Sequence, residues 1–283
     1  MEFSLTLVDV PVDQYGPVAE KAEQLGYQAV WIPEHVLIPK EISPNYPYKE
    51  SGEYLLPHDS PFVDPLVMIG HLSGRTTKIM LGTGMYILPL RNPFVAAKAI
   101  ATAQQVSHDR VILGVGLGWM REEFDIIGEA FDRRGVRADE MLEVMKKLWT
   151  GNAVEHHGEW YKFKSVQMAP GLKKSPQIVF GGTSTASIKR VVRFGDGWYA
   201  PPIEIDGAVA LRTELIRALD SAGRGVDRFP IWVRVPQPTS PEFMIKLRDA
   251  HFDRLVVQMP TTLGLSARLE WLEQIAEYRK SLN

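Results

Sequence analysis

The sequence has no cysteine among its 283 residues, which excludes disulfide bonds and thiol nucleophiles and fits a reducing cytoplasm. It also has no excess of either charge: 32 basic residues face 34 acidic ones, whereas nucleic-acid-binding proteins usually carry a basic surplus. No apolar run is long enough to cross a bilayer, and the N-terminal stretch lacks the basic and apolar regions of a secretory signal. We therefore expect a cytoplasmic protein with neither a nucleic acid nor a membrane as partner.

Two common catalytic signatures are missing as well. Neither the G-x-S-x-G turn of serine hydrolases nor the phosphate-binding G-x-x-x-x-G-K-[ST] loop occurs in the chain. His156 and His157 adjoin an expected turn at Gly158, and the sequence places no acidic or histidine partner at ligand spacing from them. We therefore expect no metal site.

What the chain does contain is a regular alternation of short, Val- and Ile-rich runs with longer amphipathic segments. The short runs are mostly continuous, as in strands buried on both faces. Eight such strands, each followed by a helix, predict an α/β fold of the (β/α)8 barrel type over residues 1–283 as one domain. An open doubly wound sheet is the alternative, but nothing in the composition marks a second domain. The expected strands are 3–8, 29–33, 78–84, 110–116, 177–182, 197–200, 231–235 and 254–259; the expected helices are 14–26, 64–76, 92–107, 132–151, 184–195, 206–223, 240–251 and 266–283.

Two longer segments interrupt the alternation. Residues 35–62 follow the second expected strand, are rich in proline and tyrosine, and are too long for an ordinary connection, which indicates a functional loop. Residues 152–176 precede the fifth expected strand and contain VEHHGEWYKF, a pattern typical of a small hairpin turning at Gly158.

The first functional candidates are the residues that follow each expected strand, because active sites of (β/α)8 barrels form at the carboxyl ends of the strands. Glu34 and His35 follow the second strand. Histidine titrates near neutral pH and can donate or accept a proton, which makes His35 a candidate for proton transfer. A histidine that merely bonds a loop carbonyl is the alternative, and the position favours neither.

A glycine pair, Gly181 and Gly182, follows the fifth expected strand and leads through TSTAS into a helix. Backbone N–H groups at a helix N-terminus attract anions, and glycine allows a phosphate to approach closely. The alternative is a tight strand-to-helix turn with Thr183 or Ser184 as the N-cap. The sequence supports both equally.

The stretch VILGVGLGWMREEF carries glycines at 114, 116 and 118. It does not complete the dinucleotide fingerprint G-x-G-x-x-G, because Trp119 stands where the third glycine is needed. Alternate residues of a strand point the same way, so the three glycines clear space on one face. That space would accept a flat ring, or it would allow the strand to pack closely against a neighbouring helix.

In their order and spacing, GYQAVWIPEH, LGTGMY, GVGLGWMREEF, GNAVEHHGEWYKF, IVFGGTS and RFGDGW resemble the luciferase-like monooxygenase superfamily. The similarity is greatest to its branch of actinobacterial oxidoreductases that use the deazaflavin coenzyme F420. It covers most of the chain up to about residue 205, after which only the barrel pattern matches. The resemblance implies a (β/α)8 barrel, in agreement with the strand count.

The resemblance also implies roles for particular residues. His35, paired with Glu34, would be the catalytic group beside the reactive ring, and the Gly84–Met85 peptide bond would be cis. Trp119 occupies the position where some relatives carry a catalytic carboxylate, so a sugar-phosphate substrate handled by such an acid is not expected. The implied cofactor contacts are Thr83, Gly84 and Met85 after the third strand, Gly116, Leu117, Gly118 and Trp119 after the fourth, and Gly181, Gly182 and Thr183 around the cofactor's phosphate.

The function implied is hydride transfer between coenzyme F420 and an organic substrate. An FMN-dependent monooxygenase and a non-catalytic flavin-binding carrier or sensor are the alternatives. The aromatic residues Tyr46, Tyr48, Tyr54 and Phe62 of the long loop would either form an apolar lid or pack on the barrel rim. Relatives commonly form homodimers through helices of the first half, and VMIGHLSG and FVAAKAIATAQQV are apolar enough to do so.

Overall fold

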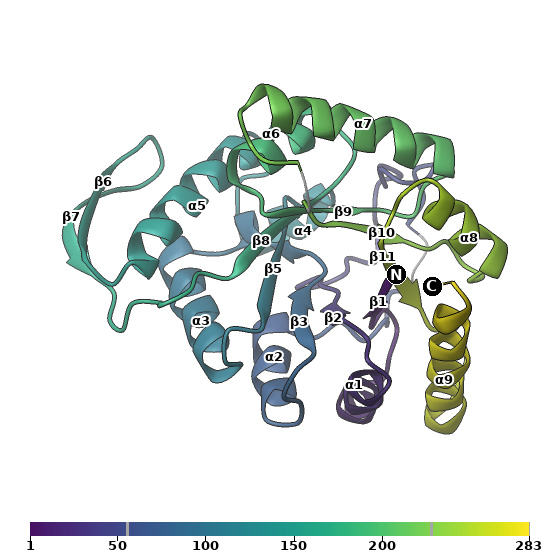
Figure 1. Ribbon diagram of the computed structural model, residues 1–283. Coiled ribbons are helices and arrows are strands. Elements are labelled where there is room, and N and C mark those ends of the chain that lie inside the picture. Colours follow the sequence, from purple (N-terminus) through teal and green to yellow (C-terminus); the bar gives the residue numbers. More distant parts are fainter. Residues whose placement is uncertain (55–56, 227–228, 283) are drawn as a thin grey trace.

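The computed structural model describes residues 1–54, 57–226 and 229–282. Its centre is a closed barrel of eight parallel strands, which confirms the predicted fold class (Figure 1). Neighbouring strands pair in the order β3-β2-β1-β11-β10-β9-β8-β5, and a further pairing of β3 with β5 closes the ring. The barrel strands are β1 (Glu2–Thr6), β2 (Ala29–Ile32), β3 (Met80–Thr83), β5 (Val111–Gly116), β8 (Gln177–Gly181), β9 (Gly197–Ala200), β10 (Ile231–Arg234) and β11 (Arg254–Gln258).

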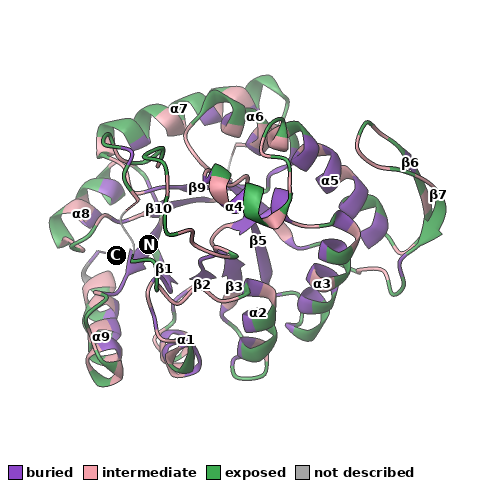
Figure 2. Cartoon of the chain, turned by 180° about the vertical axis from the view of Figure 1, so that it is seen from behind, coloured by how far each residue is buried: buried purple, intermediate pink, exposed green. Residues whose placement is uncertain are grey.

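Helices surround the barrel in Figure 1, and their burial pattern explains why they form. Figure 2 shows exposed residues on their outer faces and buried ones towards the strands, as amphipathic helices require. In the described part of the chain, no helix is both long and apolar enough to span a membrane. The helices are α1 (Tyr15–Gln24), α2 (Pro65–Ser73), α3 (Pro93–Val106), α4 (Arg121–Ile127), α5 (Arg134–Trp149), α6 (Thr185–Phe194), α7 (Ile205–Ser221), α8 (Pro241–Asp249) and α9 (Leu265–Ser281).

Two helix starts follow directly from the sequence. The side chain of Asp64 accepts hydrogen bonds from the backbone N–H groups of Leu66 and Val67, both at 2.9 Å, and Pro65 occupies the first helical position. Asn92 and Pro93 open α3 in the same way. Side-chain caps of this type satisfy backbone donors that the first helical turn leaves free.

The structure adds elements that the strand-and-helix pattern did not predict. The short helix α4 lies between β5 and α5, so the expected helix 132–151 starts at Arg134 and is preceded by a separate one. A short strand β4 (Tyr86–Ile87) extends the ladder next to β5, and the 3-10 helices η1 (Val12–Gln14) and η2 (Leu88–Leu90) precede α1 and α3.

The segment 152–176 contains an antiparallel pair of strands, β6 (Ala153–His157) and β7 (Lys162–Gln167), which projects away from the barrel in Figure 1. His156 of β6 is buried against α5. Its Nε2 lies 3.2 Å from a carboxylate oxygen of Glu140, and its Nδ1 lies 3.2 Å from Nζ of Lys147. His156 therefore has an acidic partner that its sequence neighbours did not reveal, because α5 supplies it.

The barrel interior is filled by large side chains from several strands. Trp31 of β2, Tyr199 of β9 and Trp232 of β10 form a buried cluster, with ring centroids of Trp31 and Tyr199 4.7 Å apart. Figure 2 shows this central region as buried. Because the interior is packed solid, any ligand site must lie at an end of the barrel.

Candidate active site

A cavity of about 430 Å³ opens at the carboxyl ends of the barrel strands. This volume lies within the range of roughly 300–1,000 Å³ that is usual for small-molecule sites. Of the predicted site residues, all but one line it: Glu34, His35, Gly84, Met85, Gly116, Leu117, Gly118, Trp119, Gly181, Gly182 and Thr183. The structure therefore brings together residues that follow four separate strands.

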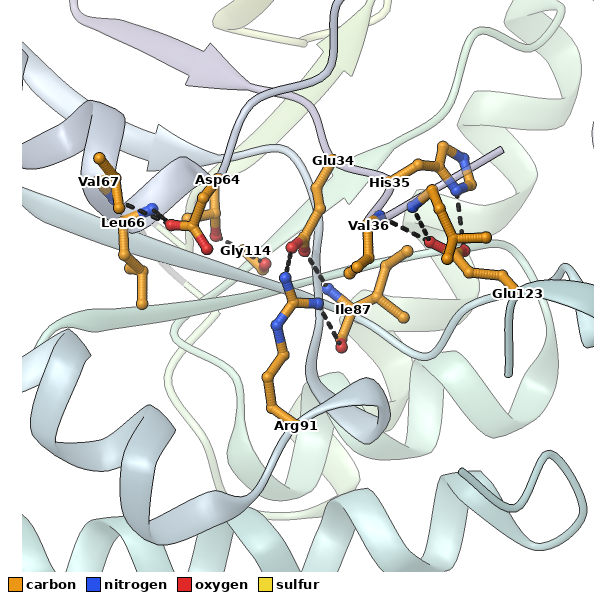
Figure 3. A network of polar contacts seen from close by, with 12 residues as sticks. Glu34, His35, Val36, Asp64, Leu66, Val67, Ile87, Arg91, Gly114 and Glu123 are labelled. Carbon is orange, nitrogen blue, oxygen red and sulfur yellow. Dashed lines mark hydrogen bonds and ion pairs between the residues drawn. The ribbon is translucent and has the colours of Figure 1, made fainter. Parts of the chain in front are cut away.

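His35 is held in the cavity wall by a carboxylate from another element. Its Nδ1 lies 3.0 Å from Oε2 of Glu123 in α4 (Figure 3). The other oxygen of Glu123 accepts hydrogen bonds from the backbone N–H groups of Val36, at 2.7 Å, and Leu37, at 3.4 Å. Because a carboxylate accepts hydrogen bonds, Nδ1 of His35 is the protonated nitrogen in this contact, and Nε2 is left without a partner among the described residues.

Glu34 points away from His35 towards the segment after β3. One of its carboxylate oxygens accepts from the backbone N–H of Ile87 at 2.7 Å, and the other forms an ion pair with Arg91 (Figure 3). Burial lowers the pKa of Arg91 to about 10, so the guanidinium stays charged at neutral pH. Both oxygens of Glu34 are thus engaged, and the residue fastens the end of β2 to the turn after β3.

The chain after β3 bulges into the barrel mouth. The Gly84–Met85 peptide bond is cis, as the sequence resemblance implied. The backbone N–H of Gly84 donates to the carbonyl of Ile32 at 2.7 Å. Met85, presented by this bulge, lines the cavity.

Thr83 is the predicted contact that the structure places elsewhere. It is fully buried, does not line the cavity, and its hydroxyl donates to the carbonyl of Gly114 at 2.8 Å. A Cβ at Gly114 would lie 2.1 Å from the carbonyl oxygen of Thr83 and 2.8 Å from Cε of Met85. The space that Gly114 clears is therefore occupied by the neighbouring strand and the bulge, rather than by a helix.

The glycine pair after β8 makes a tight turn into α6. Gly182 has φ +98°, and a Cβ there would lie 2.8 Å from Oγ of Ser187. Ser184 is the N-cap: its hydroxyl accepts from the backbone N–H of Ser187 at 3.2 Å. The N-cap interpretation is confirmed, with Ser184 in that role. The same turn keeps the backbone at Gly182 and Thr183 at the edge of the cavity.

Aromatic side chains of the long loop close over His35. Ring centroids of His35 and Phe62 are 5.1 Å apart, those of His35 and Tyr54 are 5.7 Å apart, and Trp119 lies 5.4 Å from Tyr54. Tyr46 contacts Trp119 at 5.2 Å. Burial raises the pKa of Tyr54, whose buried hydroxyl has no partner among the described residues. The loop aromatics thus pack on the barrel rim and line the cavity at once.

Glu123 is the main residue that the sequence interpretation missed, although a signal for it existed. Met120, Phe124 and Ile127 have the spacing of one helical face, and Glu123 falls on that same face. An acidic residue on the apolar face of a helix needs a buried partner. Glu122, its neighbour, faces outwards and accepts from the backbone N–H of Ser43 at 2.9 Å, a second tie between α4 and the long loop.

A family model described as luciferase-like monooxygenase matches residues 6–241. The chain belongs to this family. An uncharacterised protein of Mycobacterium tuberculosis is 30% identical over 287 residues, covering 98% of both chains. An F420-dependent glucose-6-phosphate dehydrogenase of Amycolatopsis mediterranei is 27% identical, over 66% of this chain and 54% of its own. An FMNH2-dependent dimethylsulfone monooxygenase of Pseudomonas fluorescens is 29% identical, over 49% of this chain and 40% of its own.

Solved structures share the fold of this family member over nearly its whole length. The monooxygenase RslO1 of Streptomyces bottropensis superposes with a TM-score of 0.79 at 18% identity, with 98% of each chain covered. An F420-dependent secondary alcohol dehydrogenase superposes with a TM-score of 0.76 at 14% identity, again with 98% coverage of each. The family thus includes relatives named for either deazaflavin or flavin cofactors.

Proposed function

We propose that this luciferase-like protein is an oxidoreductase that transfers a hydride between coenzyme F420 and an organic substrate. The observation that carries the proposal is His35, whose Nδ1 is fixed by Glu123 while its Nε2 has no hydrogen-bond partner among the described residues. A histidine in this state, in a cavity wall, is set to exchange a proton with a bound ligand. The relatives and solved structures named for F420 support the choice of cofactor.

The cavity fits a ring cofactor with a phosphate-bearing tail. At the turn into α6, a Cβ at Gly182 would lie 2.8 Å from Oγ of Ser187, so the turn requires glycine, and it keeps the backbone N–H groups of Gly182 and Thr183 at the edge of the cavity, where they would bind a phosphate. The ring would be held by the bulge at Gly84 and Met85 and by the segment from Gly116 to Trp119, which includes Leu117 and Gly118. When bound, the cofactor supplies the hydride chemistry, which no side chain of the protein can provide.

The protein's own contribution is a proton site in a dry pocket. Glu123 fixes the ring orientation and tautomer of His35, so that Nε2 accepts a proton from the substrate or donates one to it. The rings of Tyr54, Phe62 and Trp119 pack edge-on around the His35 ring and would shield this nitrogen from water. We propose a positioning role for Glu34, because Arg91 and the N–H of Ile87 engage both of its oxygens.

Titration of the purified protein with F420 and with FMN under identical conditions tests the cofactor. We expect F420 to bind at least about tenfold tighter than FMN, a difference of about 1.4 kcal/mol in binding free energy. Gly182→Ala should weaken binding, because its Cβ would lie in the turn, whereas Gly207→Ala, at an open position of α7, should not. Tighter binding of FMN would contradict the proposal.

An FMN-dependent monooxygenase is the second candidate, and the FMNH2-dependent relative is the observation that favours it. The same titration separates the two, and oxygen consumption in the presence of reduced FMN would establish the alternative directly. A carrier or sensor without turnover is the third. It predicts that the wild-type protein binds the cofactor but reduces no tested substrate. Separately, a His35→Ala variant that leaves substrate reduction unchanged would contradict the catalytic role of His35.

We further propose a cytoplasmic homodimer. Val67 of α2 and Val95 of α3 are 75% and 69% exposed, which leaves apolar side chains on the outer faces of the helices that form such dimers in relatives. Light scattering after gel filtration should give twice the mass of the 31.9 kDa chain. Val67→Glu combined with Val95→Glu should give the monomer mass.

A further inference from the structure

The wall of the cavity formed by β10 carries an arginine with no acidic partner. Arg234 ends β10 and lines the cavity. Its Nη2 donates to Oε1 of Gln258 at 2.6 Å, while its Nε is buried and has no hydrogen-bond partner. Among residues 1–54, 57–226 and 229–282, no carboxylate forms an ion pair with it.

The other arginines at or beside the cavity have acceptors in the protein, although Arg134 has only carbonyl oxygens and no carboxylate among the described residues. Arg190 pairs with Asp139 at 2.7 Å, and Arg91 pairs with Glu34. Arg134 donates from Nε to the carbonyl of Gly118 at 2.9 Å. A buried N–H of a charged group that lacks an acceptor is costly to the folded state, so Arg234 is the cation whose partner a ligand would supply.

Arg234 faces the same space as the aromatic loop residues. Burial raises the pKa of Tyr46, and the charge of Arg234 opposes this increase. The same two effects act on Tyr199 of β9, whose pKa is raised to about 12. Tyr46 in turn packs on Trp119, whose ring centroid lies 6.2 Å from that of His35. One continuous aromatic wall therefore connects the Arg234 side of the cavity with the His35 side.

We propose that the substrate of this oxidoreductase is an aromatic or alicyclic carboxylate, whose carboxylate binds Arg234 and whose apolar body lies against Tyr46 and Trp119. A guanidinium presents parallel N–H groups that match the two oxygens of a carboxylate. The proposed function places the phosphate of the cofactor at the turn at Gly182, at the start of α6. Arg234 is therefore not needed for the phosphate and can bind the substrate. This inference rests on the proposed function, because it places the anion of the substrate opposite the proton site at His35.

Calorimetric titration with two matched probes, trans-cinnamate and the neutral trans-cinnamamide, tests the proposal on the free and the F420-loaded protein. We expect the wild-type protein to bind cinnamate at least about tenfold tighter than cinnamamide. Arg234→Met should remove this preference, and Arg234→Lys should retain part of it. Arg190→Met, which removes a cavity arginine already neutralised by Asp139, should leave the preference intact. Thermal unfolding of each variant checks that it is folded.

Three results would overturn the proposal: equal binding of both probes by the wild-type protein, binding of neither, or a preference that survives Arg234→Met. In the last case, an accompanying loss of F420 affinity in Arg234→Met would reassign Arg234 to the cofactor. Failure of F420 to bind the wild-type protein would contradict the proposed function instead. The probe preference of the free protein is measured independently of that result.

Discussion

In the part of the chain that the structure describes, two histidines pair with buried glutamates in locally similar ways but in different surroundings. His35 lies 3.0 Å from Glu123 at the barrel mouth, and His156 lies 3.2 Å from Glu140 beneath the β6–β7 hairpin. In both pairs the glutamate also accepts hydrogen bonds from backbone N–H groups of a loop. Each pair therefore fastens a loop to a helix.

The two pairs differ in what the second ring nitrogen does. Nδ1 of His156 is occupied by Lys147, so both ring nitrogens are used inside the protein. Nε2 of His35 has no partner in the described chain, and the residue lines the cavity. A histidine–carboxylate pair is thus common structural chemistry, and the free nitrogen in a cavity is what makes one of them a catalytic candidate.

The largest difference between the two pairs is expected when each histidine is replaced by alanine. His35→Ala should lower turnover about 10²- to 10⁴-fold, because it removes the proton site. His156→Ala should leave turnover close to wild type but lower the free energy of unfolding by about 1–3 kcal/mol, because Glu140 stays buried without its partner. Steady-state kinetics with F420 and chemical denaturation measure the two effects. Equal losses of turnover in both variants would contradict the distinction.

The next largest effect is expected for substitutions of Glu123. Glu123→Gln can still accept from the N–H of Val36, but its amide would donate to Nδ1 of His35 and place the proton on Nε2. We expect kcat to fall roughly 10- to 100-fold with little change in KM. Glu123→Asp should restore part of the rate. A rise in KM together with a fall in kcat and a loss of stability would indicate a purely structural role.

The smallest effect concerns stability in acid and involves only the hairpin pair. Burial raises the pKa of Glu140, but hydrogen bonds from the backbone N–H groups of Trp160, Tyr161 and Glu159 outweigh it, so the pKa lies below the ordinary value of 4.5. A carboxyl group whose pKa is lower in the folded protein than in the unfolded chain stabilises the fold when the pH is above its unfolded pKa. This stabilisation is lost as the pH falls through the folded-state pKa. Denaturant midpoints should therefore decrease below about pH 4.5, and Glu140→Gln should flatten this dependence. An unchanged slope in the variant would exclude Glu140 as a cause.

The barrel could be predicted because strands buried on both faces and amphipathic helices each have a characteristic pattern of apolar residues in the local sequence. These patterns can be recognised without knowledge of distant contacts. His35 and the turn at Gly182 could also be predicted, since the ends of strands and the starts of helices are visible locally. Glu123 was not found in this way, and Arg234 was visible only as the end of an expected strand, with no role assigned to it. Their significance depends on partners far along the chain, or on the lack of one, and only the folded barrel brings those positions together.

The most direct test of the central claim is the protonation pattern of the histidine rings in ¹⁵N-labelled protein, measured by NMR at neutral pH before and after addition of F420. We expect His35 to carry its proton on Nδ1, its Nε2 to be unprotonated, and the Nε2 resonance to move when F420 binds. The resonances of His156 should stay in place. A proton on Nε2 of His35 in the free protein, or an Nε2 resonance that does not respond to bound F420, would show that His35 is not the proton site beside the cofactor.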